Sequence, residues 1–126
     1  MQATFFITGT NNGKGQIEDP ATPWPKLIER MSKENHQIAA HSWSHEHFLA
    51  IDADKRRDQI LKLESAFVAI LGYFPTYMRP PFVEVNDEIK AEYKRWGYHM
   101  VSRPYSPAEV SSFSNTDTNP SLLFSP

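Results

Sequence analysis

Four short apolar segments alternate with three segments of helical periodicity in the first part of this chain. The apolar segments fall at residues 3–7, 36–40, 76–78 and 98–101, and each is bounded by polar residues, glycine or proline. Segments of this length and composition are typical of buried strands. Strands that alternate with helices usually form a parallel sheet joined by right-handed crossovers. The order of segments therefore predicts an α/β fold with one parallel sheet.

The three helical segments carry start signals, stop signals or both. In the first, apolar residues recur at positions i, i+3, i+4 and i+7, namely Trp24, Leu27, Ile28 and Met31. The second covers residues 54–71, with Asp52 or Asp54 as its cap and Gly72 at its end. The buried face predicted for it consists of Ile60, Leu63, Phe67 and Ile70. The third follows Asn86, a residue that caps helices well.

Two polar motifs directly follow predicted strands. HSWSH at residues 41–45 follows the second strand, and RPPF at residues 79–82 follows the third. The carboxyl ends of parallel strands meet at one edge, where α/β proteins bind ligands. A single turn of helix at HSWSH would bring His41 and His45 to one side, and neutral imidazoles bind zinc well. The spacing thus predicts half of a metal site, which would need a third protein ligand to be catalytic.

Composition narrows the possible partners. The chain has 126 residues with 40% hydrophobic content, enough for one domain with a core, and it shows no transmembrane run. Its net charge is −2, and its basic residues are scattered, so we expect no nucleic acid and no membrane partner. It contains no cysteine, so any metal must be held by histidines and carboxylates.

Taken together, the segments resemble the polysaccharide deacetylase or NodB homology domain, especially that of fungal chitin deacetylases. The residues that carry the resemblance are ATFFITG at 3–9, HQIAAHSWSH at 36–45, PTYMRPPF at 75–82 and GYHMV at 97–101. The resemblance implies a partial, irregular (β/α) barrel that lacks the first strand and the last strands. It also implies removal of acetyl groups from polysaccharides such as chitin, with a divalent metal, usually zinc, as cofactor.

The resemblance assigns a role to each motif residue. The family pattern H-S/T-x-x-H makes His41 and His45 metal ligands and makes Ser42 a supporting group behind them. In the family pattern R-x-P-F/Y, Arg79 would orient a catalytic aspartate, and the backbone N–H of Phe82 would help to hold the oxyanion.

Two further motif residues have an expected place beside the substrate. By the same resemblance, Trp43 and Pro81 would border the groove that binds an acetylated polysaccharide or oligosaccharide. An aromatic residue next to a core is more often part of the core, so packing is the alternative for Trp43. For Arg79, the alternative is a structural contact at the strand end.

Several family parts have no counterpart in this sequence. The family places an Asp-Asp pair, which supplies the general base and the third metal ligand, on a strand before residue 3. Its later Asp-Trp and Leu-x-His segments do not appear in the sequence after residue 101. We therefore expect this chain to be weakly active or inactive. Glu46, His47 or Asp52 could supply a substitute ligand.

The domain organisation follows from these observations. Residues 1–101 are expected to form a partial deacetylase domain, and residues 102–126, rich in serine and proline, a loosely ordered tail. Two other possibilities stay open, a non-catalytic glycan-binding remnant and a fragment of a gene model. No protein partner is predicted. The N-terminus does not resemble a secretory signal, although members of the family are often secreted, so the compartment stays open.

Overall fold

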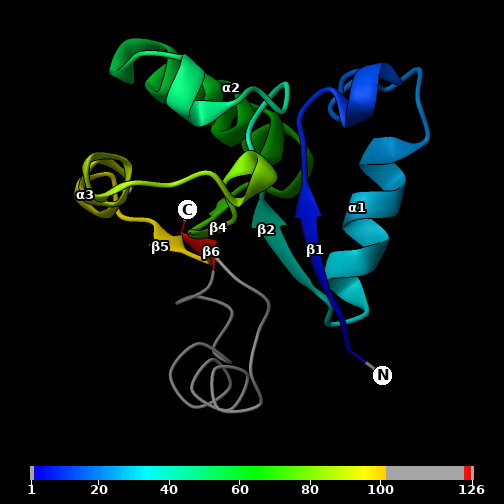
Figure 1. Ribbon diagram of the computed structural model, residues 1–126. Coiled ribbons are helices and arrows are strands. Elements are labelled where there is room, and N and C mark those ends of the chain that lie inside the picture. The colour runs from blue at the N-terminus through cyan, green and yellow to red at the C-terminus, as the bar shows by residue number, and fades with distance from the viewer. Residues whose placement is uncertain (1, 102–123, 126) are drawn as a thin grey trace.

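A parallel four-stranded sheet forms the centre of the protein in the computed structural model, which describes residues 2–101 and 124–125. The strands are β1 (Thr4–Ile7), β2 (Gln37–Ala40), β4 (Tyr77–Met78) and β5 (His99–Met100). They lie in the order β1-β2-β4-β5 and every pair is parallel (Figure 1). This arrangement confirms the predicted α/β class with a parallel sheet.

Three helices connect successive strands of this sheet. They are α1 (Trp24–Lys33), α2 (Ala53–Leu71) and α3 (Asp87–Arg95). Helix α1 packs on β2 and on α2, and α3 packs on β5 (Figure 1). Three 3-10 turns interrupt the connections: η1 (Asn11–Gly13), η2 (Phe48–Ala50) and η3 (Pro81–Val83).

Side-chain caps begin two of the helices as expected. Of the two candidate caps for α2, Asp52 is the one used, because its Oδ1 accepts the N–H of Lys55 at 2.9 Å. Asn86 accepts the N–H of Ile89 at 2.9 Å at the start of α3. Gly72 ends α2 with a φ of 81°, a conformation that costs glycine little.

A second, two-stranded sheet was not predicted. Strand β3 (Phe74–Pro75) pairs antiparallel with β6 (Phe124–Ser125). Such a short strand beside a proline has no local signal, since its pairing depends on a distant partner. Apart from residues 124–125, the tail prediction lies outside the described residues.

The core lies between the sheet and the helices. Strand β2 is buried almost throughout, and the predicted face of α2 is confirmed for Ile60, Leu63 and Phe67, with Ile70 partly buried. The other large buried side chains include Phe48, Met78, Ile89 and Tyr93. Burial of β2 on both faces fixes where its carboxyl end, and therefore His41, emerges.

A buried ion pair joins two of the helices. Arg56 of α2 and Glu92 of α3 have side chains only 6% and 4% exposed. The guanidinium binds the carboxylate through two hydrogen bonds, Nε to Oε2 at 2.8 Å and Nη2 to Oε1 at 2.7 Å. Its Nη1 also donates to the carbonyl of Phe48 at 3.1 Å. Glu92 raises the pKa of Arg56 mainly through these hydrogen bonds.

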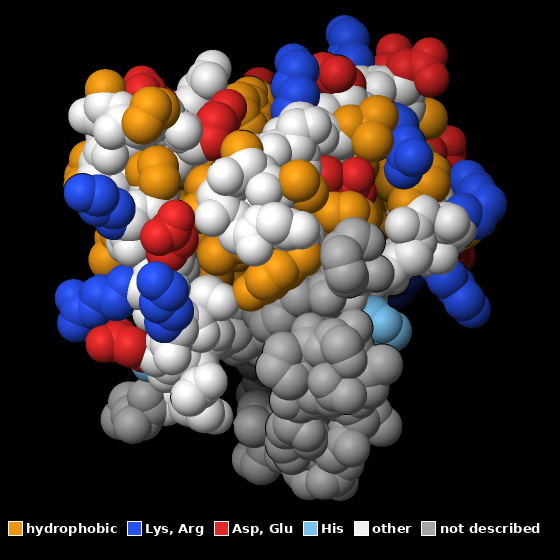
Figure 2. Space-filling view, turned by 180° about the vertical axis from the view of Figure 1, so that it is seen from behind, with side chains coloured by type: hydrophobic (Ala, Val, Ile, Leu, Met, Phe, Trp, Pro, Cys, Tyr) orange, Lys and Arg blue, Asp and Glu red, His pale blue; other side chains and the backbone are white. Residues whose placement is uncertain are grey.

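The surface mixes both signs of charge. Figure 2 shows Lys and Arg side chains interspersed with Asp and Glu side chains and with hydrophobic ones on the face in view. Within the described residues, no helix has the length and hydropathy needed to cross a bilayer.

Candidate metal centre

The HSWSH segment forms an irregular turn, and the prediction of a helical turn is wrong. Ser42 and His45 have φ angles of 71° and 59°, in the left-handed region. Ser42 is fully buried, and its Oγ accepts the N–H of His45 at 3.1 Å. This bond between side chain and backbone gives the chain an alternative to helical hydrogen bonding, which is a common effect of serine. Ser42 therefore shapes the segment that presents the imidazoles.

Gln59 of α2 supports the same turn through side-chain hydrogen bonds. Its Oε1 accepts the N–H groups of both Trp43 and Ser44 at 2.9 Å. Its Nε2 donates to the Oγ of Ser44 at 2.7 Å. Sequence reasoning missed this residue, because a glutamine beside the apolar stripe of a helix carries no signal that it faces another segment.

Trp43 packs against the end of β1. A Cβ atom added to Gly9 would lie 1.9 Å from Cε3 of the Trp43 ring, so only glycine leaves room for this contact. The backbones are also joined, since the N–H of Gly9 donates to the carbonyl of Ser42 at 3.1 Å, and the N–H of Thr10 to that of Trp43 at 2.9 Å. The indole is partly buried against the core. Its expected place beside the substrate stays a prediction.

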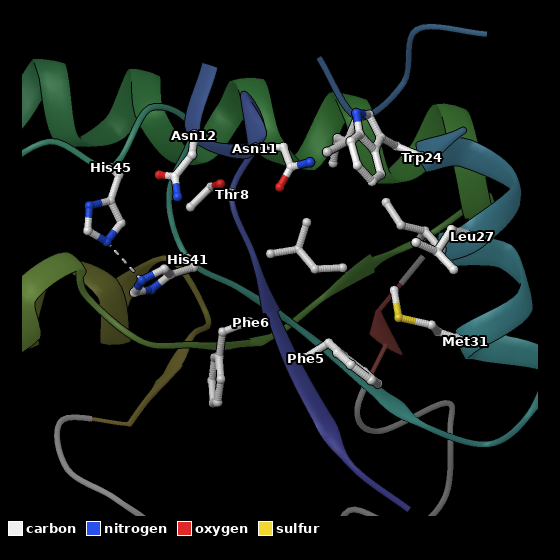
Figure 3. A pocket seen from close by; sticks show the side chains of 13 residues that line it. Phe5, Phe6, Thr8, Asn11, Asn12, Trp24, Leu27, Met31, His41 and His45 are labelled. Carbon is white, nitrogen blue, oxygen red and sulfur yellow. Dashed lines mark hydrogen bonds between the residues drawn. The ribbon is translucent and has the colours of Figure 1, made fainter. Parts of the chain in front are cut away.

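The two motif imidazoles face each other directly. The Nε2 atoms of His41 and His45 lie 3.1 Å apart, as the dashed line in Figure 3 shows. The Nδ1 of His41 lies 2.8 Å from the carbonyl oxygen of Arg79. Because a carbonyl only accepts, that Nδ1 carries the proton, and the Nε2 of His41 presents a lone pair. The proton between the rings must then belong to the Nε2 of His45.

Burial favours the neutral form of His41. It lowers the pKa of the imidazole below its usual value, and the nearby charges of His45 and Arg79 act in the same direction, while the bond to the Arg79 carbonyl opposes them. A neutral imidazole with an oriented lone pair is the form that binds zinc. The pair therefore fits two positions of a metal site, provided that His45 moves its proton to Nδ1.

The substitute ligands considered from the sequence make other contacts. Glu46 accepts a hydrogen bond from the Ser44 hydroxyl at 3.2 Å, and Asp52 caps α2. His47 lies 2.8 Å from a carboxylate oxygen of Glu84. Within residues 2–101 and 124–125, no group of three His, Cys, Asp or Glu side chains could hold a metal ion.

The RPPF segment meets the imidazole pair at the end of β4. The N–H of Arg79 donates to the carbonyl of Ala40 at 3.0 Å, which aligns the ends of β2 and β4. The guanidinium of Arg79 lies 4.4 Å from the centre of the Phe6 ring. Pro81 is fully buried. The centroids of the Phe82 and His45 rings lie 4.6 Å apart. The tertiary structure thus brings His41, His45, Arg79 and Phe82 together.

The turn at η3 has an unusual backbone. Phe82 and Val83 have φ angles of 57° and 55°. Left-handed conformations cost non-glycine residues about 1–3 kcal/mol each and often occur at functional sites. A β-branched residue such as Val83 is particularly unfavourable there.

A pocket of about 490 Å³ opens beside the imidazole pair and extends along β1 to α1 (Figure 3). His41 and His45 lie at one end with the Asn12 side chain near them, and Thr8 and Asn11 lie between this end and Trp24. The other end is apolar and is lined by residues that include Phe5, Trp24, Leu27 and Met31. The pocket therefore combines a pair of imidazoles, amide groups and an apolar wall.

The sequence profile of the family described as Polysaccharide deacetylase matches residues 1–101 of this chain. The chain belongs to that family. A chitin deacetylase from a Pestalotiopsis species is 38% identical over 102 residues, which cover 81% of this chain and 32% of that protein. A peptidoglycan-N-acetylglucosamine deacetylase from Listeria monocytogenes is 36% identical over 92 residues, or 73% of this chain and 18% of that protein.

Two solved structures illustrate that the fold is shared. The chitin deacetylase of Colletotrichum lindemuthianum aligns with a TM-score of 0.72 at 30% identity, over 79% of this chain and 42% of that chain. PdaA from Bacillus subtilis, a family 4 carbohydrate esterase, aligns with a TM-score of 0.66 at 32% identity, over 79% of this chain and 39% of that chain. This deacetylase-family chain thus spans less than half the length of each of these four proteins.

Proposed function

We propose that this chain carries the metal-binding and oxyanion-binding part of a metal-dependent polysaccharide deacetylase, with acetylated chitin as substrate and zinc as cofactor. The observation that carries the proposal is the pair of facing Nε2 atoms, 3.1 Å apart, beside the turn that contains Phe82. We also propose that the four-stranded sheet is part of an irregular barrel, since the deacetylase structures that align with it extend well beyond the aligned region.

Each residue would contribute one part of the chemistry. His41 and His45 would hold the metal, which when bound would polarise the acetyl carbonyl and acidify a water molecule. Arg79 holds the His41 tautomer through its carbonyl oxygen. The Phe82 N–H would donate to the acetyl oxygen as negative charge develops there. Ser42 holds His45 through its backbone N–H.

In this proposal, no described residue acts as the general base. The resemblance to the family implies an Asp of an Asp-Asp pair in this role, which the proposal does not assign to any described residue. Two imidazoles alone make a weak metal site, since catalytic zinc normally has three protein ligands. We therefore propose that the 126-residue chain on its own is weakly active or inactive.

Zinc binding tests the first part of this proposal. Calorimetric titration of the full chain should show binding that is lost in His41→Ala and in His45→Ala. His99→Ala is the matched control, because His99 stacks on Tyr77 and is not part of the imidazole pair. Equal zinc binding by the wild type and the His41→Ala, His45→Ala double variant would refute the assignment.

Acetate release tests the second part. Incubation with acetylated chito-oligomers and zinc should release acetate slowly or not at all, and a chelator or His41→Ala should abolish any release. Release that continues unchanged in His41→Ala would contradict the proposed role of the pair.

Non-catalytic glycan binding is the second candidate function, favoured by the pocket with its aromatic and amide side chains. It predicts that chito-oligomers shift NMR signals of Trp24 and Asn12, and that these shifts survive chelation and His41→Ala. The absence of any shift with glycan would exclude it.

A further inference from the structure

We propose that His47 is a positioning residue that holds the Phe82 turn against His45 by contacting Phe82 and Glu84, the residues on either side of Val83. This inference rests on the proposed function, because it concerns how the oxyanion donor and one metal ligand are kept in place. His47 is not part of the HSWSH motif, and the sequence suggested it only as a possible substitute ligand.

The first contact is a stack of rings. The imidazole of His47 lies parallel to the Phe82 ring, with centroids 3.8 Å apart and an interplanar angle of 4°. His45 contacts the same Phe82 ring, at 4.6 Å and 61°. Phe82 is 53% exposed, so the core does not hold its ring in place. The two histidines are therefore well placed to fix the orientation of this aromatic side chain.

The second contact is a hydrogen bond on the other side of the turn. The Nδ1 of His47 lies 2.8 Å from Oε1 of Glu84. The other carboxylate oxygen, Oε2, is buried and has no hydrogen-bond partner among the described residues. A carboxylate accepts, so Nδ1 of His47 is the donor. This bond is consequently the main polar restraint that the described residues place on the Glu84 side chain.

The strained backbone begins at the first of these contacts and continues through Val83, which lies between them. Phe82 and Val83 adopt φ angles of 57° and 55°, and residues in such conformations persist only when their surroundings enforce them. Two backbone hydrogen bonds within the turn, Val83 N–H to Pro80 and Glu84 N–H to Pro81, are both 3.1 Å long. His47 adds a ring contact before Val83 and a hydrogen bond after it. The direction of the Phe82 N–H depends on this backbone conformation.

The melting temperature and the local geometry together distinguish a positioning role for His47 from a purely structural one. The side chains of His47 and Glu84 are 54% and 28% exposed, and exposed ion pairs contribute little to the stability of a fold. A positioning role therefore predicts a change in local geometry with little change in melting temperature. A purely structural role predicts a lower melting temperature with little change in local geometry.

NMR of the metal-free, full-length chain tests this inference. His47→Ala and Glu84→Ala should shift the Phe82 amide and His45 imidazole signals while the melting temperature stays close to that of the wild type. Glu84→Gln keeps an acceptor for His47 and should resemble the wild type. His47→Phe keeps the stack but not the bond, and should restore the His45 signals more than the Phe82 amide.

The matched control is His99→Ala, which removes another histidine stacked on an aromatic ring, at 4.7 Å from Tyr77. It should leave the Phe82 and His45 signals unchanged. Unchanged signals in both His47→Ala and Glu84→Ala would overturn the inference. If His47→Ala does not fold, Glu84→Ala and Glu84→Gln decide the question alone.

Zinc affinity provides an independent readout. Groups that orient metal ligands typically affect metal affinity by about 10- to 100-fold, and we expect His47→Ala to weaken zinc binding by about tenfold. A wild-type chain that binds no zinc would refute the proposed function but leave the NMR test valid, so the two failures can be told apart.

Discussion

The Nε2 atoms of His41 and His45 face each other at 3.1 Å although the backbone between them is not helical. Left-handed conformations at Ser42 and His45, together with the Ser42 Oγ bond to the His45 N–H, bring the rings together. The arrangement of the two imidazoles thus depends on a buried hydroxyl and on the residues that hold the turn.

The pKa of His41 should lie below its usual value of 6.5 in the metal-free chain, because burial disfavours the imidazolium. Between the lowered pKa and about pH 6.5, the unfolded chain binds more protons than the folded chain. The free energy of unfolding therefore decreases as the pH falls through this range. An NMR pH titration and melting curves across this range measure both effects. His41→Gln should remove this part of the pH dependence. A midpoint at or above the usual value would contradict the assignment.

Gln59→Leu should destabilise the protein by about 2 kcal/mol or more, since it leaves the N–H groups of Trp43 and Ser44 without their acceptor. Urea unfolding measures the loss. Lys62→Ala on the exposed side of the same helix is the control and should change stability by less than about 0.5 kcal/mol. Equal effects of the two substitutions would contradict the role of Gln59.

Gly9→Ala should displace the Trp43 ring, because the new Cβ would lie 1.9 Å from Cε3. Overpacking of this kind typically costs about 1–3 kcal/mol. Urea unfolding gives the cost, and NMR signals of the indole report its displacement. In a Trp43→Ala background the same glycine substitution should cost much less. An equal cost in both backgrounds would show that the ring is not the cause.

Arg56→Met should cost about 3–5 kcal/mol, because it leaves the buried carboxylate of Glu92 without its partner. The Arg56→Met, Glu92→Leu double variant should recover much of that loss, since it removes both charges. Chemical denaturation of the three proteins checks this order. A double variant less stable than Arg56→Met would contradict it.

The sequence determined the order of strands and helices because these signals are local. Apolar runs, helical periodicity and capping residues such as Asn86 act over one or two turns, so they can be recognised without knowing any long-range contact. The same reasoning placed the HSWSH and RPPF motifs at neighbouring strand ends. It could not find β3 and β6, whose pairing joins residues far apart in the chain.

Only the tertiary structure decided how the motif residues meet. Local spacing predicted a helical turn at residues 41–45, but the segment is not helical. In the observed conformation it contacts Gln59 and Gly9, which are distant in sequence. The contacts of His47 with Phe82 and Glu84 likewise join the segments after β2 and β4. Local sequence patterns therefore located the parallel strands, the helices and the two motifs at the strand ends. The geometry of the site came from side-chain contacts between segments, which no local pattern encodes.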